Sequence, residues 1–358
     1  MQVPPAPGLI KIGIGLRQYT TGQPELERLI SELIDKAGGS PKKDLLRELI
    51  TTVIRLRDEN VGRGNLKILN STLKELRYAF KVFSPYSHIR KIALFGSART
   101  PKTHKTYRQA KEFAREITRR GWMVITGGAT GVMHAGNEGA GREKSFGVNI
   151  RLPFEQEANP VIAKDSKLIN FKYFFTRKLI FLKESHATVL FPGGFGTHDE
   201  GFETLTLVQT GKAEPRPIVC IDPPGSDYWA NWRRFIKKSL LRQKMIDPED
   251  MDLITFTHNI KEAADCITSF YRNYHSLRFV DDLLVLRMLK PISLPQLNRL
   301  NRDFQTIIRK GKISQVESPL PAEENEPETH KMTRLVFHFN RRDYSILRKM
   351  IEVINEAG

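Results

Sequence analysis

Short apolar runs separated by amphipathic stretches occupy residues 90–222, and this alternation limits the possible folds more than any other feature of the sequence. The runs read KIALFG, WMVITGG, SFGVNIRL, ATVLFPGG and RPIVCID. Strands with few polar residues, connected by helices, are typical of a parallel sheet that is covered on both faces. The sequence therefore predicts an α/β fold with a Rossmann-like, doubly wound parallel sheet.

Helical patterns flank this region. Over residues 24–85, segments such as KKDLLRELITTVIRL repeat apolar residues at three-to-four spacing and predict amphipathic helices. Residues 270–315 are also expected to be helical, and the Pro- and Glu-rich residues 316–331 are expected to form a flexible surface linker. RLVFHF then predicts a last strand, and the residues from Asp343 a last helix. The predicted domains are a helical N-terminal extension (1–87), a Rossmann-like domain (88–268), and a C-terminal helical extension with a final strand and helix (269–358).

Composition limits the class of protein. The 358 residues are 40% hydrophobic, which suits a globular chain with a real core. No stretch approaches the roughly 20 apolar residues of a membrane span, and the N-terminus lacks the basic start of a secretory signal. Cys220 and Cys266 lie far apart and match no metal spacing. We therefore expect a soluble, cytoplasmic protein without a metal site or a membrane partner.

The formal net charge of +17 favours an anionic partner. The basic residues are scattered as pairs, such as Arg119-Arg120 and Arg341-Arg342, rather than gathered in one tract with aromatic residues. The sequence also contains no recognisable nucleic-acid-binding module. A small phosphorylated molecule is therefore expected rather than nucleic acid, although simple solubility also explains a high charge.

One glycine-rich turn reads TGGATG. Gly127 and Gly128 follow an apolar run, and Thr130 and Gly131 stand where the next helix should begin. Backbone N–H groups at a helix start form an anion site where glycines allow close approach. The turn is neither a Walker loop nor a GxGxxG fingerprint. A tight strand-to-helix turn without a ligand is the alternative.

A second turn, PGGFGT, repeats this arrangement. Pro192 limits one backbone conformation, whereas Gly193, Gly194 and Gly196 free the others. Thr197 is expected to cap the following helix, and its hydroxyl could also contact a phosphate.

Three acids follow this turn directly. Asp199, Glu200 and Glu203 are expected in the first turns of the helix, where carboxylates suit the helix dipole. A phosphate next to them would be repelled, unless its ligand also offers hydroxyl groups or a developing positive charge. A ribose phosphate offers both.

These motifs resemble the Lonely Guy (LOG) family, often mislabelled lysine decarboxylases, and its larger bacterial relatives, the nucleotide monophosphate nucleosidases. PGGFGTHDE fits the family pattern PGGxGTxxE, and Arg177-Lys178 stands fifteen residues before Pro192, as the family's Arg-Lys pair does. GGATGVMHAGNEGA is similar to the family's GGGxxGxMEAxxxGA turn, FGSAR to its first-strand turn, and GVNIRLPFEQEANP to a segment of the larger members. The resemblance covers residues 88–260.

The resemblance implies an enzyme that hydrolyses the N-glycosidic bond of a nucleoside 5′-monophosphate, AMP-like or a cytokinin riboside monophosphate, to a free base and ribose 5-phosphate. It implies no metal or cofactor, and a homodimer or larger homo-oligomer. Its catalytic pair maps onto Arg177 and Glu200. The residues that it implies for substrate and phosphate binding are Gly96, Ser97, Gly127, Gly128, Thr130, Gly131, Met133, Gly193, Gly194, Gly196, Thr197 and Glu203.

The local residues suit this chemistry. Breaking an N-glycosidic bond generates an oxocarbenium-like sugar, and a carboxylate can stabilise that charge, bind the ribose hydroxyls or orient the attacking water. Glu200 is the candidate, with Glu203 or Asp199 in support. Arg177 either holds Glu200 ionised or binds the substrate. No motif marks the Schiff-base lysine that a pyridoxal phosphate decarboxylase needs.

The sequence departs from the family pattern at two positions. His134 replaces a glutamate, which leaves the substrate preference open, and Ala129 replaces a third glycine. His198 lies at a variable position of the motif, and we interpret it as a surface residue. Two alternative functions remain, a carrier of nucleotides or of a phosphorylated cofactor such as the molybdenum cofactor, and a nucleotide sensor. The intact pair of Arg177 and Glu200 favours the enzyme.

Overall fold

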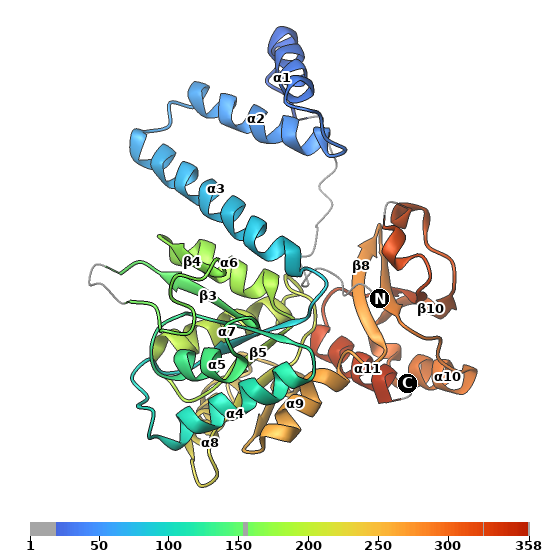
Figure 1. Cartoon of the computed structure of the whole chain (residues 1–358). Coiled ribbons are helices and arrows are strands. Elements are labelled where there is room, and N and C mark those ends of the chain that lie inside the picture. Colours follow the sequence, from blue (N-terminus) through green and yellow to red (C-terminus); the bar gives the residue numbers. More distant parts are fainter. Residues whose placement is uncertain (1–18, 153–156, 325, 357–358) are drawn as a thin grey trace. The chain divides into compact units, whose positions relative to one another are not determined.

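The structure is a computed structural model that describes residues 19–152, 157–324 and 326–356 (Figure 1). The described residues form two compact units. The first ends at Lys74, and the second contains the chain from Glu75 on.

The first unit is helical, as the apolar spacing of residues 24–85 predicts. It contains α1 (Pro24–Lys36), α2 (Lys43–Asp58) and the beginning of α3 (Arg63–Phe83). Proline at the first position of α1 suits a helix start, because its missing N–H would have no partner there. The helix α3 continues into the second unit, where it is followed by a short 3₁₀ turn, Ser84–Tyr86.

The second unit is built on a seven-stranded parallel sheet with the order β4-β3-β2-β1-β5-β6-β7. The strands are β1 (Lys91–Phe95), β2 (Met123–Thr126), β3 (Ser145–Ile150), β4 (Leu168–Phe171), β5 (Ala187–Leu190), β6 (Ile218–Ile221) and β7 (Ile254–Thr257). From β1 the chain moves outward through β2, β3 and β4, and then returns to place β5 on the other side of β1. This is a doubly wound, Rossmann-like sheet, so the predicted fold class is confirmed.

Helices cover both faces of this sheet. The helices are α4 (Lys105–Arg119), α5 (Val132–Ala140), α6 (Phe174–Glu184), α7 (Phe195–Gln209), α8 (Tyr228–Phe235) and α9 (Ile260–Ser269). Ile92 and Leu94 of β1 pack in one core with residues of α4, α5 and α9, whereas Ala93 and Phe95 pack in a second core with residues of α6, α7 and α8. Alternate residues of one strand therefore serve two cores, which explains why polar residues are rare in these strands.

The C-terminal region is not mainly helical, so the prediction for residues 270–315 is wrong. It forms a four-stranded antiparallel sheet with the order β10-β11-β9-β8 and two helices. The elements are β8 (Tyr274–Val280), β9 (Leu283–Met288), α10 (Leu294–Asp303), β10 (Ile308–Val316), β11 (Thr333–Phe339) and α11 (Tyr344–Glu356). Strands β8 and β9 are joined by two aspartates, of which Asp281 has a φ of 52°. A short apolar run beside such a turn is a strand signal, but buried strands and helices share the same composition. The predicted last strand and helix are confirmed.

The predicted flexible linker over residues 316–331 is also wrong. Glu323 lies within it and is fully buried. Arg287 Nε donates to its Oε1 at 2.7 Å, and Arg334 Nε donates to its Oε2 at 2.8 Å. The Glu323 carboxylate and the two arginines hold this segment against the sheet. Separating them would leave buried charges without a partner, which is costly.

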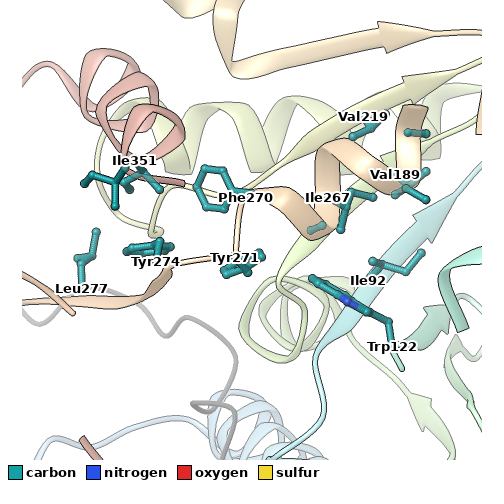
Figure 2. Close-up of a cluster of buried hydrophobic side chains, with 14 of the residues drawn as sticks. Ile92, Trp122, Val189, Val219, Ile267, Phe270, Tyr271, Tyr274, Leu277 and Ile351 are labelled. Atoms are coloured by element: carbon teal, nitrogen blue, oxygen red, sulfur yellow. The ribbon is translucent and has the colours of Figure 1, made fainter. Parts of the chain in front are cut away.

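One continuous core joins the C-terminal region to the α/β sheet (Figure 2). Ile92 and Val189 contribute from the sheet, Phe270 and Tyr271 from the residues after α9, and Ile351 from α11. In the part of the chain that the structure describes, no helix is long and apolar enough to cross a bilayer, and no group of histidine, cysteine and acidic side chains could hold a metal ion.

Candidate active site

The loops after β1 and β5 meet where the direction of strand order reverses. Ser97 N–H donates to the Pro192 carbonyl at 3.1 Å and ties the two loops together. Ligands of open α/β sheets bind at such a switch point, outside the carboxyl ends of the strands. A cavity of about 750 Å³ lies here.

Most of the predicted site residues line this cavity. They are Gly96, Ser97, Gly127, Met133, Arg177, Gly193, Gly194, Gly196, Thr197 and Glu200. The sequence analysis did not single out the other lining residues as ligand contacts, and these are Phe95, Ala98, Arg99, Phe181, Phe195 and His198. Four predicted residues do not line it, namely Gly128, Thr130, Gly131 and Glu203.

The turn before α5 packs against the loop after β1. Thr130 Oγ1 donates to the Ala98 carbonyl at 2.9 Å, and Val132 N–H donates to the Ser97 carbonyl at 3.0 Å. Gly131 has a φ of 64°, and a Cβ atom there would lie 2.2 Å from the Ser97 carbonyl oxygen. Gly128 N–H donates to the Thr126 hydroxyl at 3.0 Å. Most of this turn therefore has the geometry of a tight strand-to-helix turn that supports the neighbouring loop.

The glycines of PGGFGT differ in what requires them. At Gly193 a Cβ would lie 2.1 Å from Thr197 Oγ1, so packing requires glycine there. At Gly194 and Gly196 a Cβ would meet no atom within 4 Å, and neither residue has a positive φ. Neither packing nor backbone conformation explains these two glycines, yet both line the cavity. A ligand that approaches the bare main chain would explain them.

The helix α7 begins one turn earlier than its predicted cap. Gly194 is the N-cap, so the prediction that Thr197 caps the helix is wrong. Thr197 lies in the first turn instead, is buried, and lines the cavity. The first N–H groups of a helix have no partner within it, and Phe195 and Gly196 bring those of α7 to the cavity wall. The start of α7 can therefore bind an anion.

The three acids after this turn lie beyond the first turn of α7. The helix dipole acts within the first turn, so it does not explain them. They gather instead around Lys178 on α6. Lys178 Nζ lies 3.0 Å from Asp199 Oδ2, 2.7 Å from Glu203 Oε2 and 3.7 Å from Glu200 Oε2. No role of Lys178 is predictable from the Arg-Lys pair alone, because these contacts form between two helices.

Arg177 and Glu200 face each other at the buried side of the cavity. Arg177 Nη2 lies 3.6 Å from Glu200 Oε1, and the two side chains are only 14% and 6% exposed. The guanidinium also lies over the rings of Phe174 and Phe181, with its carbon 4.8 and 5.7 Å from their centroids. Within the described chain, Glu200 Oε1 and Arg177 Nε are buried without a hydrogen bond. Unpaired buried polar atoms are costly and mark a site built for something else to bind.

Burial dominates the electrostatics of Glu200. It raises the pKa of this carboxyl group from 4.5 to about 7, against the positive charges of Lys178 and Arg177. The negative charges of Glu203 and Asp199 contribute to this rise. A carboxyl group with a pKa near neutrality can exchange protons at physiological pH, which is what general acid–base chemistry requires.

The two histidines of the motifs differ from expectation. His198 is half-buried and lines the cavity, so its interpretation as a surface residue is wrong. Its Nε2 lies 2.7 Å from the hydroxyl of Tyr228, a residue on α8 that the sequence analysis missed. His134 is buried against the ring of Tyr107, with centroids 5.9 Å apart, and burial lowers its pKa. It does not line the cavity.

Comparison with known proteins gives a family, a curated relative and several similar solved structures. A family described as "Possible lysine decarboxylase" matches residues 127–267. The cytokinin riboside 5′-monophosphate phosphoribohydrolase of Mycobacterium tuberculosis is 26% identical over 174 residues, which are 46% of this chain and 87% of that protein.

Similar solved structures include a molybdenum cofactor binding protein from Rippkaea orientalis. It is 18% identical, with a TM-score of 0.35, over 51% of this chain and 95% of that one. The molybdenum cofactor carrier protein of Chlamydomonas reinhardtii is 20% identical, with a TM-score of 0.31, over 49% of this chain and 93% of that one.

Proposed function

We propose that this chain, which belongs to the LOG family, hydrolyses the N-glycosidic bond of nucleoside 5′-monophosphates, with release of a free base and ribose 5-phosphate. The observation that carries the proposal is the pairing of two features in one cavity. Gly194 and Gly196 offer bare main chain to this cavity, and Glu200, one turn further along α7, offers a buried, partly unpaired carboxylate. A ribose phosphate needs both, because it carries an anion at one end and hydroxyl groups beside the reacting carbon.

In this proposal the start of α7 binds the 5′-phosphate. The N–H groups of Phe195 and Gly196 lack partners in the helix, and the dipole of α7 favours a negative charge at this end. The hydroxyl of Thr197, which lies in the same turn, is a further donor. Binding the phosphate at the start of α7 positions the ribose near Glu200, which lies one turn further along the same helix.

Glu200 is the proposed group for the reacting carbon. As the bond between C1′ and the base nitrogen breaks, positive charge develops on the sugar, and a nearby carboxylate stabilises it. Water adds its hydroxyl group to C1′ and loses its other proton, and the base nitrogen released from C1′ gains one proton, so that the base departs as the neutral molecule. A carboxylate with a pKa of about 7 is able to take that proton near neutral pH.

Arg177 and Lys178 hold Glu200 from two sides in this proposal. Both cations lie beyond hydrogen-bond distance of the carboxylate, at 3.6 and 3.7 Å. They lower its pKa without occupying its oxygens by a hydrogen bond, so the carboxylate can accept one from the substrate. A Schiff-base mechanism has no support in this cavity, since no lysine is among its described lining residues.

Product analysis tests the proposal. The purified chain is incubated with a panel of nucleoside monophosphates, AMP first, and free base and ribose 5-phosphate are separated and quantified. We expect release by the parent protein and a loss of roughly a hundredfold or more in kcat for Glu200→Gln and Arg177→Ala, as is usual when a group that stabilises transition-state charge is removed. Glu184→Gln is a matched control, because Glu184 is a buried, ion-paired glutamate that does not line the cavity.

The outcomes separate the candidate functions. Release by the parent and by Glu184→Gln, but not by the two site variants, would support the nucleosidase. A parent protein that binds nucleotides and releases no base from any of them would refute hydrolysis and favour a carrier or sensor.

A further inference from the structure

The hydroxyl of Tyr228 reaches the glycine-rich loop from the first residue of α8. It donates to the Gly193 carbonyl oxygen at 2.5 Å and lies 2.7 Å from His198 Nε2. Tyr228 is not among the described residues that line the cavity, whereas Gly193 and His198 are. The hydroxyl therefore contacts two lining residues without lining the cavity itself.

The direction of these hydrogen bonds follows from the number of protons. A carbonyl oxygen only accepts, so the single proton of the Tyr228 hydroxyl goes to Gly193. The hydroxyl oxygen must then accept from His198, which requires a proton on Nε2. Neutral His198 in this tautomer and protonated His198 both meet that requirement. The contact therefore does not depend on the charge of His198.

Ring packing fixes the two side chains in this arrangement. The rings of His198 and Tyr228 are nearly parallel, with an interplanar angle of 19° and centroids 6.0 Å apart. Trp229 packs edge-on against Tyr228 at 4.9 Å and against His198 at 6.0 Å. A contact that packing holds in place positions its target more accurately than one on a mobile side chain.

The bond to Gly193 sets the orientation of the next N–H group. In a trans peptide the C=O and the following N–H point in opposite directions, and the described chain contains no cis peptide bond. With the Gly193 carbonyl held toward Tyr228, the Gly194 N–H points the other way, toward the cavity that both glycines line. Gly194 is the N-cap of α7, so this N–H has no partner in the helix.

We propose that Tyr228 and His198 are positioning residues, which hold the Gly193–Gly194 peptide so that the Gly194 N–H binds the phosphate of the substrate. Glycine has the widest choice of backbone conformations, so a peptide between two glycines rotates easily unless something holds it. The hydroxyl of Tyr228 supplies that restraint without contacting the ligand. The inference rests on the proposed function for the nature of the ligand, a ribose phosphate.

The test uses Tyr228→Phe in the full chain, because this substitution removes only the hydroxyl group. Ribose 5-phosphate is titrated into the parent and variant proteins by calorimetry, with ribose as the ligand that lacks the anion. We expect the Kd for ribose 5-phosphate to rise roughly five- to tenfold, which corresponds to the partial loss of one hydrogen bond to an anion. With AMP, KM should rise by a similar factor while kcat changes less.

Tyr271→Phe is the matched control. Its hydroxyl also donates to a backbone carbonyl, that of His186, at 2.6 Å, but it lies in the core beside the C-terminal region. This variant should lose a comparable amount of thermal stability and bind ribose 5-phosphate as the parent does. His198→Leu should weaken the binding of ribose 5-phosphate less than Tyr228→Phe does. The double variant should bind about as weakly as Tyr228→Phe alone, because both side chains act through the same hydroxyl group.

The outcomes for this inference and for the proposed function are distinguishable. If the parent binds ribose 5-phosphate and hydrolyses AMP, and Tyr228→Phe does both equally well, the positioning role is overturned and the function stands. A parent that binds no ribose 5-phosphate would overturn the anion site and both proposals. If Tyr228→Phe does not fold, His198→Leu decides, and unchanged binding by that folded variant would overturn the inference.

Discussion

Replacing Glu200 by glutamine should make the folded state less sensitive to alkaline pH. The native carboxyl group has a pKa of about 7 because of burial, compared with 4.5 for an ordinary glutamate, such as the unfolded chain contains. Between these two values the native state binds more protons than the unfolded state, so the free energy of unfolding falls as pH rises. The penalty is nearly absent below pH 4.5 and complete above pH 7. Glutamine does not ionise, so it removes this dependence.

The size of the effect follows from the two pKa values. The pKa in the native state is about 2.5 higher than in the unfolded chain, and each pKa unit corresponds to about 1.36 kcal/mol. The ionisation of Glu200 therefore lowers the free energy of unfolding by roughly 3 kcal/mol at pH 8. At pH 5 the penalty is about 1 kcal/mol, because this pH lies only about half a unit above the pKa of 4.5 in the unfolded chain. From pH 5 to pH 8 the variant should therefore gain roughly 2 kcal/mol in the free energy of unfolding relative to the parent. Glu200 is only 5% exposed, so solvent screening changes this little.

Urea unfolding measures this difference. Trp122 and Trp229 are both buried in the α/β domain, and their fluorescence reports its unfolding. The parent and Glu200→Gln are unfolded at several values from pH 5 to pH 8, and the difference between them is plotted against pH, since all other titrating groups cancel.

Asp199→Asn is the matched control for this series. It also removes a carboxylate from Lys178, but one whose side chain is 58% exposed. A difference between parent and Glu200→Gln that stays constant across the pH range would refute the raised pKa. A trend that the Asp199 variant shares would assign the effect to Lys178 rather than to burial.

Three further predictions concern the loop, the pH profile and the C-terminal sheet. Gly194→Ala should lower kcat/KM for AMP by about tenfold or more, with little change in melting temperature, because the added Cβ meets no protein atom within 4 Å. Gly193→Ala should lower both kcat/KM and the melting temperature, because its Cβ would lie 2.1 Å from the Thr197 hydroxyl oxygen. If Gly194→Ala were fully active, the bare loop would not be a ligand surface. Lys178→Met removes the positive charge that lowers the pKa of Glu200 most. The acid limb of the pH profile of kcat/KM is expected near pH 7 in the parent, and it should move to higher pH in this variant. A limb that does not move would exclude Glu200 as its source. Glu323→Gln should destabilise the C-terminal sheet by about 3–5 kcal/mol in urea unfolding, because it leaves two buried arginines without their shared carboxylate, and a neutral effect would contradict a structural role for that carboxylate.

The fold was predictable where the strands are buried on both faces. The central strands of the parallel sheet are nearly continuous apolar runs, and glycine marks their ends. The edge strands β4 and β7 escaped notice because each leaves half of its residues partly exposed, so Leu168–Phe171 and Ile254–Thr257 carry a weaker apolar signal. The helix prediction for the hairpin of β8 and β9 is wrong for the opposite reason. Its apolar residues are so dense that periodicity cannot distinguish a strand from a helix there.

Apart from Arg177, which the family resemblance supplied, the candidate site was predictable where it lies in glycine-rich turns that follow strands of the sheet, because such turns meet at one edge of a parallel sheet. The glycines and acids of the motif lie within a dozen residues of one another, and a strand-to-helix turn brings them to one place. Lys178 reaches the acids of α7 from α6, and Tyr228 reaches the glycine-rich loop from α8. Which side chains these two helices turn toward the site depends on tertiary packing. No spacing rule within the sequence carries that information, which is why His198, whose partner is Tyr228, looked like a surface residue.

Stability and the proposed activity make opposite demands on this loop and helix. A chain selected for folding alone could place alanine at Gly194 and Gly196, where a Cβ meets no atom, and would thereby lose less backbone entropy on folding. It could also replace Glu200, whose ionisation burial opposes. Each of these residues is a poor choice locally, and all three line the same cavity at the switch point of the sheet. Local choices that cost stability and converge on one site are typical of function, because binding and catalysis require what folding would remove. Substitutions that leave stability equal or higher but abolish base release would therefore be stronger support for the proposed site than losses that accompany unfolding.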